Sequence, residues 1–180
     1  TFVNVNAYDQ AVASARFMGG REFEVIQQGQ RVEPTKQDVL NVLNGPRMLL
    51  PSVEIGSGPF QGRQMQWHRG EPEIGTGQRS AALSFYLALM TGTCLKLVSG
   101  AGPTIVEGPF ARNPEFLAML HAVTARPILT NAAVTGTSIG AAMLLDGNDF
   151  PRELDQFETA LPLDKLRTYA DLWTELAGAE

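Results

Sequence analysis

The amino-acid sequence predicts one α/β domain in which helices cover a sheet. Strand-like and helix-like segments alternate along the second half of the chain, an order typical of layered α/β architectures. The chain has 180 residues, of which 44% are hydrophobic and 18% are charged, so it can bury one core but hardly two. One apolar segment of helical length, residues 80–98, suits the centre of that core.

The first elements are predicted to be a β-hairpin and a short helix. Residues 1–17 alternate loosely between apolar and polar side chains around the turn sequence Ala-Tyr-Asp-Gln. Gly19 and Gly20 then open an amphipathic helix that runs through Gln28. Gly29 can end this helix because it accepts a left-handed conformation without steric cost.

A second helix, a buried strand and a long loop are predicted next. Thr35 is a good N-cap, and Asp38 stands three residues later as in a capping box. Gly45 and the proline after it end this helix, and residues 47–51 form a short buried strand. Residues 52–79 are rich in Gly, Pro and polar groups and show little periodicity, which indicates a surface loop.

The rest of the chain is predicted to alternate between strands and helices. The buried helix at 80–98 is followed by four elements: a strand at 104–107, a helix that starts near 113, a strand at 126–130 and a helix near 137–145. Pro162 starts the last helix, which has Leu166 and Trp173 on its apolar face and ends at Gly178.

Charge and cysteine content narrow the function classes. The net charge is −5 and no basic cluster appears, so a nucleic-acid surface is not expected. The single Cys94 excludes an internal disulfide and a cysteine-cluster zinc site, which makes the reducing cytoplasm the expected location. Segment 80–98 is long enough to span a bilayer, but it contains Ser, Thr, Gly and Lys96 and lacks basic flanks. We therefore interpret it as a core helix and expect no membrane.

The segment with most chemical information is the one around Gly108. The predicted strand 104–107 runs directly into Gly108, and a helix opens at Asn113, which builds a crevice at the carboxyl end of a strand. Glycine lets a flat ligand approach the backbone, and an asparagine amide both donates and accepts hydrogen bonds. The sequence Asn-Pro-Glu is also simply a good helix start, so spacing alone leaves both interpretations open.

A family resemblance favours the ligand site. The order EGPFARN, then a helix, then RPILTN and TGTSIGAAML is similar to the adenosine segment of the FGGY carbohydrate kinases. The upstream segment RFMGGREFE resembles the part of that family in which a glycine opens a helix against the nucleotide phosphates. The similarity covers roughly residues 10–147 and looks closest to rhamnulokinase- and fuculokinase-like members. It implies an actin-like ATPase (ribonuclease H-like) domain with a mixed central sheet flanked by helices.

The resemblance implies roles for individual residues. Gly20 would sit beside the phosphates, and Phe23 and Glu24 would face the nucleotide one turn further along. Gly108 would lie under the adenine and ribose, and Asn113 would hydrogen-bond to the nucleoside.

The chain departs from the family where consecutive glycines are usual. Here Pro109 and Phe110 follow Gly108. Pro109 removes a backbone donor, and Phe110 could narrow the pocket or stack on the base. We count both among the nucleotide-binding residues.

The implied function is that of one half of an enzyme. Residues 1–180 would be the C-terminal, nucleotide-binding domain of a two-domain sugar kinase that uses ATP and Mg²⁺ to phosphorylate a small sugar or ketose. The sugar site and catalytic base would lie in the N-terminal kinase domain, so we assign no catalytic and no metal-binding residue here and expect the fragment alone to be inactive. The sequence leaves open which sugar is used, and whether a homodimer forms.

Two alternatives belong to other classes. The first is a non-catalytic nucleotide- or sugar-responsive binding module, or a degenerate kinase relative, which the Pro109-Phe110 departure keeps open. The second, a Rossmann-type oxidoreductase, is discounted because no GxGxxG motif follows a first strand.

Overall fold

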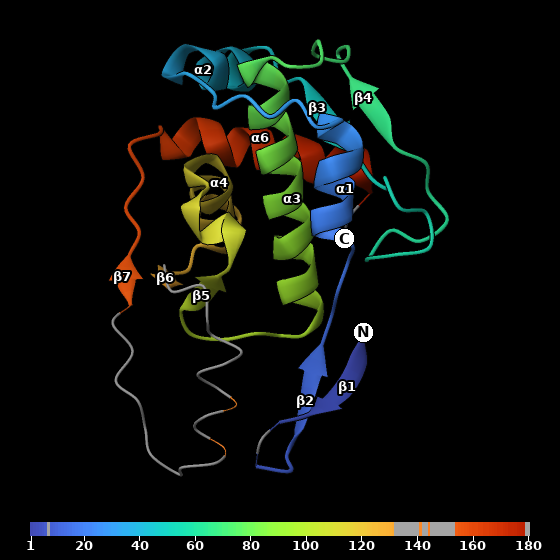
Figure 1. Ribbon diagram of the computed structural model, residues 1–180, viewed down its shortest axis with the longest axis vertical. Helices are drawn as coiled ribbons and strands as arrows, with labels where there is room; N and C mark the ends of the chain where they lie inside the picture. Colours follow the sequence, from blue (N-terminus) through green and yellow to red (C-terminus); the bar gives the residue numbers. More distant parts are fainter. Residues whose placement is uncertain (7, 132–140, 142–143, 145–153, 179–180) are drawn as a thin grey trace.

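The computed structural model describes residues 1–6, 8–131, 141, 144 and 154–178. Within these residues the chain is α/β, as predicted, with helices and small sheets. The sheets lie around a helical core (Figure 1). The helix predicted near 137–145 lies outside the described residues apart from positions 141 and 144.

Helix α3 (Gly77–Leu97) is the central element (Figure 1). It begins three residues earlier than predicted because Thr76 caps it, with the Thr76 side chain accepting a hydrogen bond from the Arg79 amide. The helix packs against α1, α2, α4 and β3, and its side chains from 79 to 90 are buried. It is long and apolar enough to cross a membrane, but 67% of its apolar window is buried inside this fold, as a core helix requires.

Helices α1 (Gly19–Gln27) and α2 (Lys36–Asn44) both pack on α3, with α1 beside it and α2 near its upper end in Figure 1. The predicted capping box of α2 is confirmed, because Thr35 and Asp38 exchange both of its hydrogen bonds. Helix α1 ends one residue earlier than predicted, since Gln28 itself adopts the left-handed conformation with φ 51°.

The predicted N-terminal hairpin is confirmed. Strands β1 (Phe2–Val5) and β2 (Ala11–Ser14) pair antiparallel and extend away from the helices (Figure 1). The Asn6 side chain fixes the turn, because its Oδ1 accepts from the amides of Tyr8 and Gln10 at 3.0 Å each.

The interpretation of residues 52–79 as a structureless loop was incomplete. Strand β4 (Gln66–His68) lies inside that stretch and pairs antiparallel with β3 (Met48–Leu50), the predicted buried strand. A three-residue strand is too short to show a period of two, so the sequence gives no clear signal for it.

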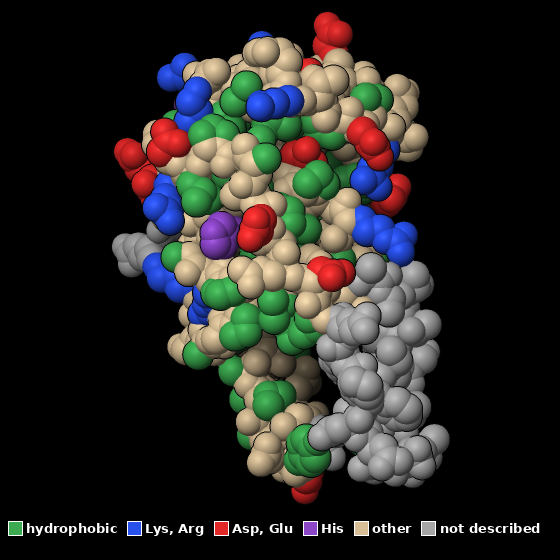
Figure 2. All heavy atoms as spheres, turned by 90° about the vertical axis from the view of Figure 1, so that its left-hand side faces the viewer, with side chains coloured by type: hydrophobic (Ala, Val, Ile, Leu, Met, Phe, Trp, Pro, Cys, Tyr) green, Lys and Arg blue, Asp and Glu red, His purple; other side chains and the backbone are tan. Residues whose placement is uncertain are grey.

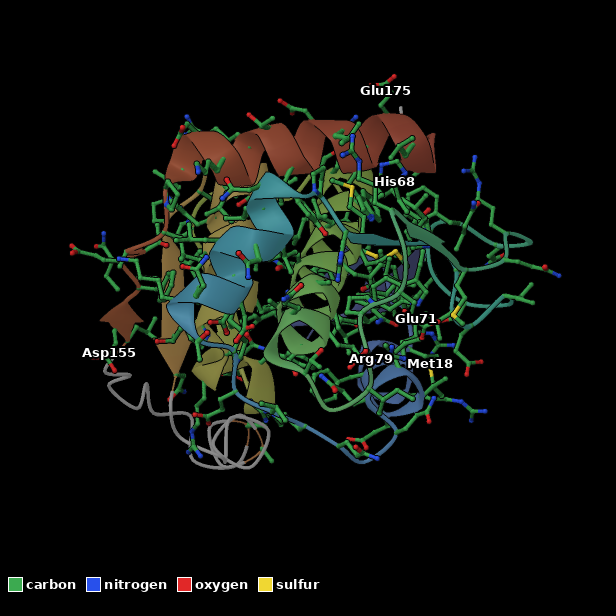
Figure 3. The ribbon with its side chains drawn as sticks, turned by 90° about the horizontal axis from the view of Figure 1, so that it is seen from above. Met18, His68, Glu71, Arg79, Asp155 and Glu175 are labelled. Carbon is green, nitrogen blue, oxygen red and sulfur yellow. The ribbon has the colours of Figure 1, made fainter. Side chains whose placement is uncertain are left out.

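Buried Arg79 joins this region to α1. Its guanidinium pairs with Glu71 at 2.7 Å (Figure 3) and also donates to the backbone carbonyls of Pro72 and Ile26. The charge of the buried guanidinium is thus satisfied by one carboxylate and two carbonyl groups.

The three-stranded sheet has the mixed character that was predicted. Strands β5 (Thr104–Glu107) and β6 (Ile128–Asn131) are parallel, and β7 (Asp155–Gln156) pairs antiparallel with β6. The sequence analysis did not anticipate β7, which has only two residues. A 3-10 turn (Pro109–Arg112) and α4 (Pro114–Thr124) connect β5 to β6.

The last helix, α6 (Leu163–Ala177), passes behind α3 in the view of Figure 1 and packs on α4, α2 and β3 (Figures 1 and 3). It starts after Pro162 and ends at Gly178, as predicted. Trp173 anchors it, because this side chain is 1% exposed and its indole N–H donates to the Leu49 carbonyl at 2.8 Å.

Helices α3 and α4 lie side by side and run in the same direction. Their first halves meet at Ser84 and Asn113, and their second halves meet at Gly92 and Val123. The contact at Gly92 is close, because a Cβ placed there would stand 2.7 Å from the Val123 side chain.

Candidate functional site

A pocket of about 190 Å³ lies beyond the carboxyl end of β5, facing α1. It is lined by Gly20, Phe23, Glu24, Arg31, Pro109, Phe110 and Asn113. Six of the seven residues singled out in the sequence therefore line one pocket, although they come from segments more than eighty positions apart. Open α/β sheets usually bind ligands at this end of their strands.

Gly108 does not line the pocket itself, but it forms the turn after β5 that directs Pro109 and Phe110 toward the pocket. Its φ of 78° and ψ of −160° belong to a region that only glycine adopts easily. A Cβ at this position would meet no described atom within 4 Å. The backbone at the tip of β5 is therefore open on that side, and the glycine is required by its conformation rather than by crowding.

Aromatic rings form the wall of the pocket. The rings of Phe23 and Phe110 make an edge-to-face contact with their centroids 5.9 Å apart. The Phe110 ring also packs at a tilt on the Phe116 ring, with a centroid distance of 5.2 Å. Phe110 thus packs against the chain's own rings and narrows the pocket. The Arg31 guanidinium lies over the Phe23 ring, 5.8 Å from its centroid, and adds a positive charge at the rim.

Asn113 is part of the fold as well as of the pocket. The side chain is 6% exposed; its Oδ1 accepts from the Phe116 amide and its Nδ2 donates to Ser84 Oγ, both at 2.9 Å. The helix-capping interpretation is confirmed. An asparagine amide has two N–H groups and an oxygen with two lone pairs, so one donor and one acceptor position lie beyond these two contacts.

A neighbouring pocket of about 260 Å³ shares Phe23, Arg31 and Asn113 with the first. Its floor carries the hydroxyls of Ser80 and Ser84, which are buried. The sequence analysis did not single out Arg31 or the serines. Two serines four residues apart in an otherwise apolar helix were the available signal, because that spacing places both on one face.

Two comparisons identify the family. The family described as "Carbohydrate kinase FGGY, C-terminal domain" matches residues 1–153. The chain belongs to the FGGY carbohydrate kinase family. The match is longer than the stretch of roughly 10–147 on which the sequence resemblance rested.

A solved structure agrees with the FGGY assignment. The crystal structure of a carbohydrate kinase from Novosphingobium aromaticivorans is similar to this chain, with a TM-score of 0.83 and 34% identity over 98% of the chain. The chain covers 40% of the length of that kinase. The predicted actin-like ATPase fold is consistent with this match. No curated protein matches the chain.

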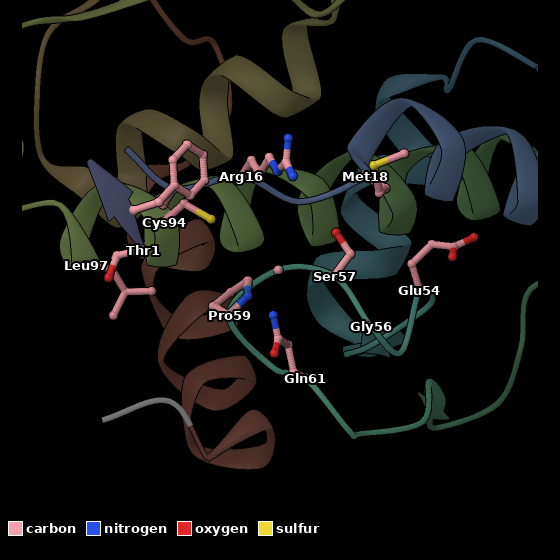
Figure 4. Close-up of a pocket in the computed structure, with 13 residues that line it drawn as sticks. Thr1, Arg16, Met18, Glu54, Gly56, Ser57, Pro59, Gln61, Cys94 and Leu97 are labelled. Carbon is pink, nitrogen blue, oxygen red and sulfur yellow. The ribbon is translucent and has the colours of Figure 1, made fainter. Parts of the chain in front are cut away.

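The FGGY domain has a larger pocket, of about 600 Å³, which none of the predicted site residues lines. It lies between the hairpin and the loop that carries Glu54, Ser57 and Gln61 (Figure 4). Cys94 lines it as well, and burial raises the pKa of that thiol, as expected for a packing residue.

The two histidines of the FGGY domain do not line the pocket at the end of β5. The Nδ1–H group of His121 donates to the Arg126 carbonyl at 2.7 Å, and His68 belongs to β4. Among the described residues, no group of three or more His, Cys, Asp or Glu side chains could hold a metal ion. On the described part of the face in Figure 2, basic and acidic side chains are interspersed and form no single basic patch.

Proposed function

We propose that this chain, residues 1–180, is the C-terminal nucleotide-binding domain of an ATP-dependent kinase that phosphorylates a small sugar or ketose. The pocket between α1 and the tip of β5 would receive the adenosine. The observation that carries this proposal is the convergence of Gly20, Phe23, Glu24, Pro109, Phe110 and Asn113 on one pocket of an FGGY domain.

The residues of the pocket fit an adenine nucleotide. The open backbone at Gly108 leaves room for a flat base, and the second N–H of Asn113 would donate to the nucleoside. Gly20 lies in the first turn of α1, where no described side chain caps the helix. The amides of that turn and the positive end of the helix dipole favour the phosphates.

The ATP would bring Mg²⁺ on its phosphates, and Mg²⁺ would neutralise charge during phosphoryl transfer. The described part of this chain would bind and orient the nucleotide. The N-terminal kinase domain, our proposed partner, would supply the catalytic base and the sugar site. Closure of the two domains would exclude water and align the reactants. We place the kinase in the cytoplasm, in keeping with its single cysteine.

A pair of glycine substitutions tests the proposal. Gly108 and Gly102 have nearly equal φ values, 78° and 75°, and a Cβ at either would meet no described atom within 4 Å. Gly108→Val and Gly102→Val therefore both place a β-branched residue at a positive φ, but only the first places a side chain at the tip of β5. We expect Gly108→Val to weaken ATP binding to the chain at least about tenfold by calorimetry, and Gly102→Val to leave it unchanged. Equal affinities of the two variants would count against the adenosine site.

The second candidate is a non-catalytic nucleotide- or sugar-responsive module, or a degenerate kinase relative. Phe110 favours it, because this ring narrows the pocket where the family usually has glycine. Incubating the full-length protein with ATP, Mg²⁺ and a panel of sugars separates the two. ADP release that appears only with a particular sugar supports the kinase, whereas ATP binding without turnover on any sugar supports the module.

A further inference from the structure

Six buried polar side chains interrupt the apolar contacts around α3. We call them the polar seam: Glu22 and Gln27 of α1, Ser80, Ser84 and Tyr86 of α3, and Asn113 at the start of α4. All six are less than 10% exposed. Polar groups are costly inside a core, so their concentration around α3 calls for a reason.

The seam ties both walls of the nucleotide pocket to α3. On the α1 side, the Tyr86 hydroxyl donates to Glu22 Oε2 at 2.7 Å, and Gln27 Nε2 donates to Ser80 Oγ at 3.0 Å. On the α4 side, Asn113 donates to Ser84. Helix α3 is therefore the common support of the two segments whose separation sets the width of the pocket.

A displacement of α1 at Glu22 would change the shape of the pocket. Its neighbours along the helix, Gly20, Phe23 and Glu24, line the pocket while Glu22 points to the opposite side, into the core. Loss of the Glu22–Tyr86 bond would loosen α1 on α3 and move these three residues together, because a short helix shifts as a rigid unit.

The surroundings of Glu22 disfavour its charge. The residue is 0% exposed, and within the described chain its Oε1 has no hydrogen-bond partner. Burial raises the pKa of Glu22 above 4.5, and the nearby Glu54 carboxylate raises it further, although the Tyr86 hydroxyl and the Glu54 backbone act in the other direction. Arg21, the residue before Glu22 in α1, pairs with Glu54 at 2.6 Å.

The two buried titratable groups that interact with Glu22, Tyr86 and Cys94, stay neutral. Burial and the neighbouring Glu22 raise the pKa of Tyr86, so its hydroxyl remains a donor at every pH of interest. The buried Cys94 thiol also has a raised pKa. The group that titrates in this seam is therefore Glu22.

We propose that Glu22 is a positioning residue of the nucleotide pocket, and that it holds α1 against α3 in its neutral form. This inference rests on the proposed adenosine site. Since the folded chain holds the proton more tightly than the unfolded chain, the stabilisation is complete below pH 4.5 and is lost as the pH rises through the raised pKa. Nucleotide affinity should decline over the same range.

The test is adenosine binding to the chain between pH 5 and pH 9, with thermal unfolding recorded on the same samples. Adenosine has no group that titrates in this range, so any pH dependence comes from the protein. If only the form with neutral Glu22 binds, the Kd rises about tenfold for each pH unit above the pKa of Glu22. Glu22→Gln keeps a neutral side chain of the same shape and should bind with a constant Kd.

Two further variants complete the experiment. Asp164→Asn makes the same carboxyl-to-amide change on an exposed turn of α6 and should follow the wild type. Tyr86→Phe removes the bond without changing the packing of the ring, and should weaken binding about threefold to tenfold at every pH while the chain stays folded.

The outcomes are distinguishable. A Glu22→Gln chain with the pH profile of the wild type would overturn the role of Glu22, as would a Tyr86→Phe chain of unchanged affinity. Adenosine binding at no pH by the folded wild-type chain would overturn the proposed function itself.

Discussion

Replacing Asn113 by alanine should destabilise the chain by about 2 kcal/mol. The substitution removes the cap of α4, where Oδ1 accepts from the Phe116 amide, and such a loss costs about 1 kcal/mol. It also removes the bond from Nδ2 to Ser84, and a hydrogen bond between buried groups contributes about 1 kcal/mol more.

Asn113→Asp separates these two contributions. An aspartate keeps an oxygen for the Phe116 amide and suits the N-terminus of a helix, but it cannot donate to Ser84. The Ser84 hydroxyl already donates to the Ser80 carbonyl at 2.8 Å, so it does not replace the missing donor. We therefore expect the aspartate variant to lose about 1 kcal/mol, half of the alanine effect.

Urea unfolding measures both variants, provided that the slopes agree with that of the wild type. A loss below about 0.5 kcal/mol for Asn113→Ala would refute the reasoning, because it is within the range of ordinary surface substitutions. An aspartate variant that is as unstable as the alanine variant would show that the cap contributes little.

The remaining predictions concern catalysis, the core and the thiol. In the full-length kinase, both Asn113 variants should raise the KM for ATP more than the KM for sugar; equal changes in both constants would contradict its placement on the nucleoside. The isolated chain should show no sugar-dependent ATP hydrolysis, and clear turnover would refute our division of roles between the halves. Trp173→Phe leaves the Leu49 carbonyl without its donor and should cost about 1–3 kcal/mol in urea unfolding. Cys94 should react with a thiol reagent only slowly until urea unfolds the chain, since burial raises its pKa; rapid labelling of the folded chain would contradict this.

Local signals in the sequence were sufficient for the helices and most strands. Thr35 and Asp38 form the capping box that their spacing indicates, and Asn113 begins α4 as its type and position predict. These signals act between neighbours in the chain, so they can be read without knowing the fold. Strands β4 and β7 could not be found in this way, because strands of two or three residues depend on partners far away in the sequence.

The pocket was partly predictable for the same reason. A glycine at the end of a strand and a glycine at the start of a helix carry a local signal, and both lie at the site. The contribution of Ser84, by contrast, arises from the packing of α4 on α3. Nothing near Ser84 in the sequence indicates that it supports Asn113, so this part required the structure.

The close contact of Gly92 with Val123 makes the far end of α4 a sensitive point. A methyl group on residue 92 would press on Val123 and force α4 to pivot. Because α4 begins after Asn113, the pivot would reach the proposed nucleoside pocket from the opposite end of the helix. Gly92 thereby sets how closely the far end of α4 can approach α3, and ligand affinity at the proposed site would depend on a position that no ligand touches.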